Sequence, residues 1–330
     1  MKKIVLCFLL LLIVVTGCGK YDKDDAIKDL EKKINDNNYY LEGNLEIVNN
    51  DEVYNYEVKS SYKKSDNYKV ELLNKSNNHE QVILKNSEGV FVITPALNKS
   101  FKFQSDWPYN NSQIYLLQSV INDIKNDNKK DFKKNKDGYI FTTEVNYPNN
   151  RKLVKQDIYM DKDLNIKKIK VYDENGIALI TMNYKKIDYN PTFKKNHFSI
   201  DKVMESANQE EKVKQVASID DSIYPLALPT GTKLSTEEKV SKTNGERVIL
   251  TFEGEKPFLL VEETANVFDE FTIIPTSGDP YILQDTVGVM GTNSLNWTTG
   301  GIEYYIVSDV LNQNELVEIA SSINTLPTMK

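Results

Sequence analysis

The stretch KSFKFQSDWPYNNSQIYLLQSVINDI, residues 99–124, decides the fold that the sequence predicts. Phe101 and Phe103 alternate with polar residues, which is the pattern of one face of a β-strand. The Trp107-Pro108 pair ends the strand, because proline has no N–H to donate to a sheet. Apolar residues then return at helical spacing, at Ile114, Leu117, Ile121 and Ile124. We therefore expect an abrupt strand-to-helix corner whose broad apolar face lies over a sheet.

The helix of this corner is expected between Ser112 and Lys125, with Asn110, Asn111 or Ser112 as its N-cap. Two interpretations of its apolar face are open. In the first, the face fills the core beneath the helix. In the second, it borders a ligand groove or a partner surface. The residues concerned are Phe101, Phe103, Trp107, Ile114, Leu117 and Ile121.

Strand patterns flank the corner on both sides. Period-two alternation with many β-branched and aromatic residues runs over residues 39–94 and returns over residues 138–189, which favours an antiparallel meander. Residues 21–35 carry an apolar stripe at helical spacing, with acidic residues first and lysines near the end, so we expect a helix there. The Asn175-Gly176 pair predicts a hairpin with a type I′ turn.

The N-terminus has the pattern of a bacterial lipoprotein signal. Two lysines precede an apolar run over residues 4–15, which is too short to span a membrane comfortably. The run ends in Val-Thr-Gly-Cys, residues 15–18, which resembles a lipobox. The resemblance implies a signal peptide over residues 1–17, diacylglycerol on Cys18 and a fatty acyl chain such as palmitate on the new amine. The protein is then expected on the outer face of the cell membrane; the alternative is an ordinary signal peptide with an accidental cysteine.

Charge divides the remaining chain into two parts. Residues 18–200 contain 30 Lys and Arg against 27 Asp and Glu, whereas residues 201–330 contain 9 against 21, a net charge of −12. This contrast favours two domains, over residues 18–200 and 218–330, joined by a polar linker over residues 201–217. The acidic balance argues against nucleic acid as a partner, since phosphates require a basic surface.

The second part carries short strand patterns followed by one helix. Asn312 with Glu315 three residues later forms a capping-box signature, and an apolar stripe follows it. We expect a small α+β domain.

The Ser-Asp-Trp-Pro corner and the order helix, strands, helix, strands resemble the lipoprotein-carrier family of LolA and LolB. They resemble more closely the Gram-positive sporulation and germination lipoproteins related to that family. The resemblance implies an α+β fold in which a curved antiparallel half-barrel surrounds apolar side chains and helices cover its open side. The stretch WTTGGIEYYIVSDVLNQNELVEIASSI, residues 297–323, resembles a C-terminal domain of the DUF4367 type.

Catalytic and metal-binding motifs are absent from the sequence. His79 and His197 are the only histidines, and neither has a second histidine or a cysteine at metal-ligand spacing. The stretch from Asp161 to Asn165 imitates the start of a calcium loop, but Ile166 stands where that loop needs glycine, so we predict a β-turn. No catalytic residue, metal or cofactor is expected.

These observations favour a membrane-anchored, non-catalytic binding or regulatory module in sporulation, spore germination or envelope maintenance. The family resemblance implies support of a cell-wall amidase, so the expected partner is a protein of that kind. The alternative is a carrier or chaperone that holds a lipid or acyl chain in a half-barrel cavity near Phe101, Phe103 and Leu117. A hydrolase built from acids that the fold brings together is a third interpretation.

Overall fold

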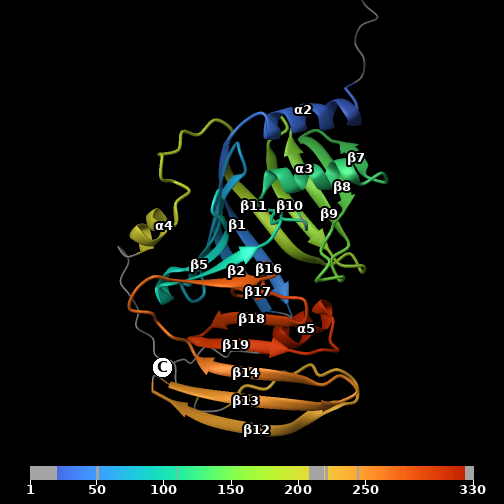
Figure 1. The fold of residues 1–330 in the computed structure, drawn as a ribbon. Coiled ribbons are helices and arrows are strands. Elements are labelled where there is room, and N and C mark those ends of the chain that lie inside the picture. Colours follow the sequence, from blue (N-terminus) through green and yellow to red (C-terminus); the bar gives the residue numbers. More distant parts are fainter. Residues whose placement is uncertain are drawn as a thin grey trace, which may run out of the picture.

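The computed structural model describes residues 21–49, 52–109, 111–207, 219, 222–243 and 245–323. Cys18, Asn110 and residues 208–217 of the predicted linker lie outside these residues. The described chain is mostly β-sheet with a few helices, in agreement with the expected α+β class (Figure 1).

The first sheet has twelve strands in the order β15-β6-β5-β4-β3-β2-β1-β11-β10-β9-β8-β7. Eleven of them come from the first part of the chain and pair antiparallel, as the meander prediction requires. Their bounds are β1 (Tyr39–Asn49), β2 (Glu52–Lys63), β3 (Asn67–Asn74), β4 (Glu80–Asn86), β5 (Gly89–Thr94), β6 (Lys99–Gln104), β7 (Asp131–Lys134), β8 (Gly138–Glu144), β9 (Lys155–Asp161), β10 (Ile166–Tyr172) and β11 (Ala178–Asp188). A short 3₁₀ helix, η1 (Pro95–Leu97), joins β5 to β6.

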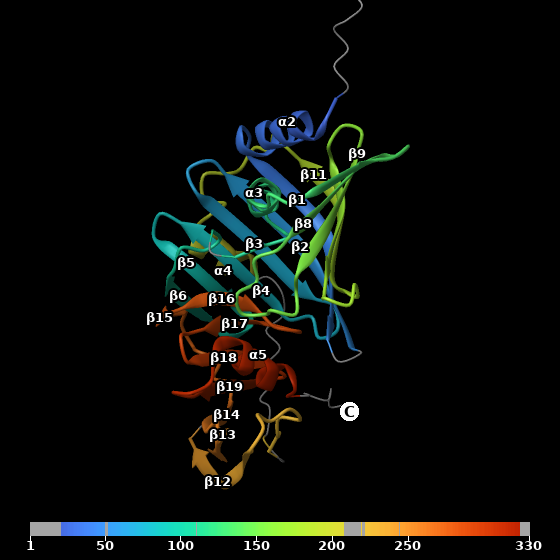
Figure 2. The same ribbon diagram turned by 90° about the vertical axis from the view of Figure 1, so that its right-hand side faces the viewer.

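Two helices cover the concave face of this sheet. α3 (Leu117–Asn126) lies within its curve, and α2 (Lys23–Asn35) crosses its end (Figure 2). α2 begins with a capping box between Asp22 and Asp25. Ala26, Leu30 and Ile34 of its apolar stripe are fully buried, and Ile27 is partly buried. The helix predicted over residues 21–35 is therefore confirmed.

The corner differs from its prediction at the start of the helix. α3 begins at Leu117 rather than near Ser112, and its N-cap residue Leu116 offers no side-chain cap. Ser112 instead donates its backbone N–H to the Asn146 carbonyl at 2.7 Å and its hydroxyl to Asp123 at 3.0 Å. These long-range bonds keep residues 111–116 out of the helix. The Trp107-Pro108 peptide bond is cis.

Aromatic side chains connect the corner to the sheet. The ring centroids of Tyr39 and Tyr62 lie 5.4 Å apart, those of Tyr62 and Tyr68 4.9 Å, and those of Tyr68 and Trp107 5.9 Å. The Tyr39 hydroxyl accepts a hydrogen bond from the Leu117 N–H at 3.2 Å, which fixes the start of α3 against β1. The interior of the first sheet is therefore continuous with the helix that covers it.

The turn between β10 and β11 also differs from its prediction. Gly176 has a φ of 79°, but Asn175 keeps a negative φ, so the turn is not type I′. The Asp173 carboxylate accepts hydrogen bonds from the N–H groups of Asn175 and Ile177, at 3.0 and 2.7 Å. This side-chain bonding holds a conventional turn that is followed by a left-handed glycine.

The turn over residues 161–165 is the predicted β-turn, since the Leu164 N–H donates to the Asp161 carbonyl at 3.1 Å. The Lys33 ammonium of α2 donates to the Asp163 carbonyl at 2.8 Å and to Asn165 Oδ1 at 2.7 Å. These two oxygen atoms, which a calcium loop would direct at its ion, are therefore hydrogen-bonded to a lysine ammonium.

The second sheet has seven strands in the order β12-β13-β14-β19-β18-β17-β16. α5 packs on its buried face, whereas α4 lies beside the first sheet (Figure 1). The bounds are β12 (Thr232–Lys242), β13 (Gly245–Gly254), β14 (Phe258–Thr264), β16 (Asp279–Ile282), β17 (Val287–Met290), β18 (Ser294–Thr299), β19 (Ile302–Val307), α4 (Ile200–Ala207) and α5 (Gln313–Ser321).

The second part of the chain also completes the first sheet. β15 (Thr272–Ser277) pairs in parallel with β6, and Gly278 alone separates it from β16 in the other sheet. Gln81 of β4 adds a buried polar contact between the parts: its Oε1 accepts from the Val287 N–H and the Thr286 hydroxyl, and its Nε2 donates to the Val287 carbonyl at 3.0 Å. Strand pairing and buried hydrogen bonds therefore join the two sheets.

Candidate functional site

The apolar residues singled out at the corner occupy different places. Phe103, Trp107, Leu117 and Ile121 are buried in the core of the first sheet. Phe101 is partly buried beneath Lys99, whose Nζ lies 4.5 Å from the ring centroid. The interior that was the expected carrier cavity is filled at these positions. Of the six residues, Ile114 alone lines the large cavity described next.

That cavity, the junction cleft, lies between the first sheet and α5 and has a volume of about 640 Å³. Strands β1 and β11 form one wall, α5 forms another, and β16 with the loops around residues 111–115 and 147–153 completes it. Apolar side chains from these elements include Leu45, Ile47, Leu179, Ile180, Tyr281 and Val317. The cleft is thus built from both parts of the chain.

The wall from β1 follows from its alternating sequence and a bulge. β1 and β11 shift register between Glu42 and Gly43, which increases the local twist. A Cβ on Gly43 would lie 2.5 Å from the Asn183 carbonyl oxygen, so only glycine fits this close approach. Beyond the bulge, Leu45 and Ile47 point to the inner face and reach the cleft.

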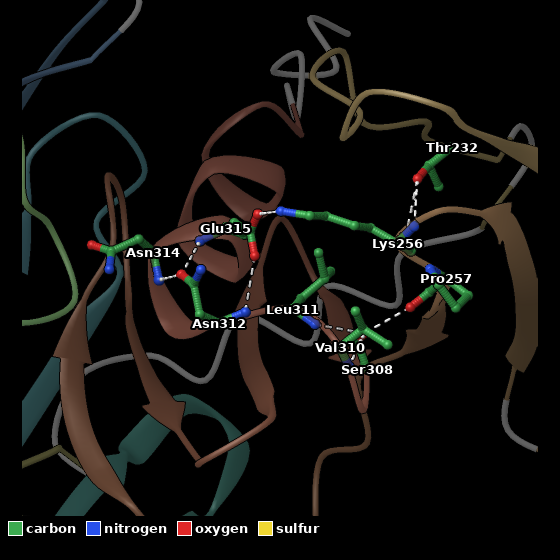
Figure 3. Close-up of polar contacts among 9 residues, drawn as sticks. All are labelled: Thr232, Lys256, Pro257, Ser308, Val310, Leu311, Asn312, Asn314 and Glu315. Carbon is green, nitrogen blue, oxygen red and sulfur yellow. Dashed lines mark hydrogen bonds and ion pairs between the residues drawn. The ribbon is translucent and has the colours of Figure 1, made fainter.

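The α5 wall is held by its cap (Figure 3). Asn312 Oδ1 accepts from the N–H groups of Asn314 and Glu315, at 3.0 and 3.2 Å, and Glu315 accepts from the Asn312 N–H at 3.0 Å. Lys256 pairs with the Glu315 carboxylate, and Ser308 bonds to the Pro257 carbonyl at 2.6 Å. The predicted capping box is confirmed, and these contacts fix the helix end that faces the cleft.

The rim of the cleft is polar and links the two walls. Asn49 donates to the Ser321 carbonyl at 3.2 Å, the Arg151 N–H donates to Asn314 Oδ1 at 3.1 Å, and the Lys152 ammonium lies 3.7 Å from the Glu318 carboxylate. Amide side chains are frequent in the lining, at Asn111, Gln113, Asn149, Asn150, Asn312 and Asn314. The cleft therefore offers hydrogen-bond donors and acceptors beside apolar surface.

The lining is suited to binding rather than to acid–base or metal chemistry. Its two carboxylates, Glu315 and Glu318, each lie beside a lysine. Neither histidine lines the cleft, and burial lowers the pKa of both His79 and His197 to about 4. Among the residues that the structure describes, no cluster of three or more acidic, histidine or cysteine side chains is placed to bind a metal ion.

Sequence reasoning missed the junction cleft. Its amides belong to segments about 160 residues apart, and no periodic pattern relates them. Cys18, the predicted lipidation site, lies outside the described residues. No helix within those residues combines the length and apolar character needed to cross a bilayer.

Comparisons with known proteins place the chain in a family. Residues 1–198 match the family described as "Sporulation protein YdcC-like". "Sporulation protein YdcC" of Bacillus subtilis (strain 168) is 34% identical over 332 residues, which cover 98% of each chain.

Solved structures give weaker matches. A chain from the complex of the CwlD amidase from Clostridioides difficile with the GerS lipoprotein is 24% identical, covers 53% of this chain and 100% of its own, and has a TM-score of 0.32. A chain from the Pseudomonas aeruginosa MucA/MucB complex is 14% identical, covers 91% of this chain and 96% of its own, and also has a TM-score of 0.32. The sequence matches confirm the predicted relationship to sporulation proteins: the chain belongs to the family of YdcC-like sporulation proteins.

Proposed function

We propose that this protein is a lipid-anchored, extracytoplasmic and non-catalytic binding module that acts in sporulation, spore germination or envelope maintenance. The observation that carries the proposal is the junction cleft, which combines apolar walls from both sheets with a rim of amide side chains. In this proposal strands β1 to β11 with α2 and α3 are the half-barrel over residues 18–200, residues 201–217 are the linker, and residues 218–330 are the acidic domain of the DUF4367 type.

The chemistry of the cleft favours a protein segment as its occupant. A peptide presents backbone N–H and C=O groups at regular spacing between its side chains, and it needs partners for both kinds of group. The amides of Asn149, Asn150 and Asn314 supply donors and acceptors beside the apolar side chains of Ile47 and Ile180. A cell-wall amidase is the first partner to test, because the Ser-Asp-Trp-Pro corner resembles lipoproteins that support such an enzyme.

A carrier of lipid or acyl chains is the second candidate function. The apolar wall formed by Leu45, Ile47, Leu179 and Ile180 is a surface on which an acyl chain can lie. An acyl chain leaves the amide rim without partners, which is why we place this function second.

Two isoleucines test the binding function: Ile180 of β11 and, as its control, Ile177 in the turn before that strand. Ile180 lines the cleft, whereas Ile177 is 57% exposed in the turn and lies outside the lining. We expect the tagged full chain from sporulating cells, examined by native mass spectrometry, to carry a stoichiometric protein partner. Ile180→Glu should lose that partner because a charge enters the apolar wall, and Ile177→Glu should keep it. A bound lipid without any protein would favour the carrier, and partner retention by a folded Ile180→Glu protein would refute the cleft as the binding site.

The two cysteines test the membrane anchor. Cys18→Ala removes the predicted acyl attachment, so the protein should appear in the soluble fraction after cell fractionation. Cys7→Ala alters a cysteine inside the predicted signal peptide and should leave the protein in the membrane fraction. The anchor hypothesis fails if the Cys18→Ala protein still sediments wholly with membranes.

A further inference from the structure

A second pocket, of about 260 Å³, lies beside α3 and is lined mostly by polar side chains. We call it the amide pocket and define it by Gln118, Asn122, Asp123 and Asn126 of α3, together with Tyr109 and Glu144. Neither the binding of a partner in the junction cleft nor the family relationship gives these residues a role.

Gln118 is the feature that points to a ligand. Its side chain is only 7% exposed, and its Nε2 has no hydrogen-bond partner. The Tyr39 hydroxyl accepts from the Leu117 N–H at 3.2 Å and donates to Gln118 Oε1 at 2.9 Å, which leaves Nε2 as the unpaired half of the amide. A buried donor without an acceptor is unfavourable, so an acceptor that enters the pocket and pairs with Nε2 is favoured there.

Two further side-chain amides line the pocket and are exposed to solvent. Asn122 and Asn126 lie one helical turn apart on α3, both are exposed, and neither side chain makes a hydrogen bond within the described chain. Each amide presents a donor and an acceptor together. A hydroxyl group also both donates and accepts hydrogen bonds. An acetamido group presents an N–H donor and a C=O acceptor that can pair with the acceptor and donor of a side-chain amide.

The acids of the pocket do not form a cation site. Asp123 already accepts hydrogen bonds on both oxygens, from the Ser112 hydroxyl at 3.0 Å and from Gln156 Nε2 at 2.7 Å. Burial raises the pKa of Asp123 to about 6, which weakens it further as a metal ligand. The Lys129 ammonium lies 3.7 Å from the Glu144 carboxylate. A neutral hydrogen-bonding ligand therefore suits the pocket better than a divalent cation.

We propose that the amide pocket binds a neutral sugar that carries hydroxyl and acetamido groups, as part of a glycan chain. Gln118 Nε2 donates to an oxygen of the sugar, while Asn122 and Asn126 pair with its outer polar groups. Tyr109, 56% exposed, is held beside the mouth by bonds from its hydroxyl to Tyr68 and Asp66 and offers apolar ring surface to the sugar.

The test is isothermal titration calorimetry of the full chain in detergent with tetra-N-acetylchitotetraose, an oligomer of N-acetylglucosamine. We expect saturable binding to the wild-type protein and at least about tenfold weaker binding to the Asn122→Ala/Asn126→Ala variant, since two hydrogen-bonding groups are lost. Asn55 and Asn190 are exposed asparagines outside the pocket, so the matched Asn55→Ala/Asn190→Ala control should bind like the wild type.

Three results would overturn the proposal. The first is no saturable binding by the wild type at about 10 mM sugar. The second is equal affinity of the two double variants, each shown to be folded by its thermal unfolding. The third is binding of Ca²⁺ or Mg²⁺, but not of the sugar, that Asn122→Ala/Asn126→Ala abolishes. None of these results involves capture of a protein partner, so failure here is distinguishable from failure of the proposed function.

Discussion

The interior under α3 and the junction cleft are both built on apolar faces of the first sheet, yet one is filled and the other is hollow. Under α3, Trp107, Leu117 and Ile121 occupy the space against the strands. At the cleft, Leu45, Ile47 and Ile180 face α5 across a cavity of about 640 Å³. The difference lies in the covering element. The segment over residues 105–116 leads directly from β6 of the first sheet to α3, whereas α5 follows the last strand of the second sheet. Apolar alternation in a strand thus indicates burial without indicating what covers it.

The largest expected effect on the free energy of unfolding comes from removing a large side chain from the filled interior under α3. Trp107→Ala should lower the free energy of unfolding by about 3–5 kcal/mol, because the indole is fully buried and packs edge-on against the Tyr68 ring. Tyr305→Ala, which truncates a 38% exposed aromatic of β19, is the control and should cost much less. Urea unfolding measures both, and a cost below about 1 kcal/mol for Trp107→Ala would mean that the side under α3 is not tightly packed.

A smaller effect is expected where polar bonds join the two sheets. Gln81→Met keeps the shape of the side chain but leaves the Val287 N–H and C=O buried without partners, so it should cost about 2–3 kcal/mol. Gln104→Met makes the same change at an exposed position of β6 and should cost less than about 0.5 kcal/mol. Equal costs for the two variants would show that these hydrogen bonds contribute nothing to the junction.

Asp285, next to the cleft residue Gln284, gives the junction a pH dependence. Burial raises the pKa of Asp285, and the Thr299 hydroxyl only partly offsets this. The stability that this group contributes is therefore present below its unfolded pKa of about 3.9 and is lost as pH rises through its higher folded value. Asp285→Asn should be more stable than the wild type at pH 8 and should lose that advantage near pH 3. Thermal unfolding across this range checks the sign, and an advantage that grows in acid would contradict it.

The smallest expected effect concerns the rim. The Lys152 and Glu318 side chains are 69% and 56% exposed, and their charged atoms lie 3.7 Å apart. Lys152→Ala should therefore change the free energy of unfolding by less than about 1 kcal/mol, and added salt should reduce the change further. A larger loss would show that the rim, rather than the buried junction, holds α5 over the first sheet.

The sequence predicted correctly those elements whose ends are fixed by hydrogen bonds between residues close in the chain. The α5 start was predictable because Asn312 and Glu315 satisfy each other's backbone groups within one turn. The α3 start was not, because Ser112 bonds to Asn146 and Asp123 instead of capping the helix. The type I′ prediction was wrong for the same reason, since the Asp173 carboxylate reshapes the turn.

The candidate site was less predictable than the fold. Of the six apolar residues singled out at the corner, Ile114 alone reaches the cleft, and it was singled out for its spacing on an expected helix rather than for its place in a loop. The cleft exists because β15 pairs with β6 and so brings α5 to β1, and strands separated by more than 160 residues leave no mutual pattern in the sequence. Cys18 stays a prediction, since it lies outside the described residues.

Because β15 lies far after β6 in the sequence, β6 is synthesised long before the strand that pairs with its outer edge. A chain that emerges from its N-terminus has made eleven strands of the first sheet, including the whole β6 edge, long before residues 272–277 arrive. Until then β6 presents unpaired backbone groups along one side, which is the kind of edge on which strands of other molecules add. A chain that stops before Thr272 keeps that edge permanently, so the last third of the protein protects the first two thirds from aggregation.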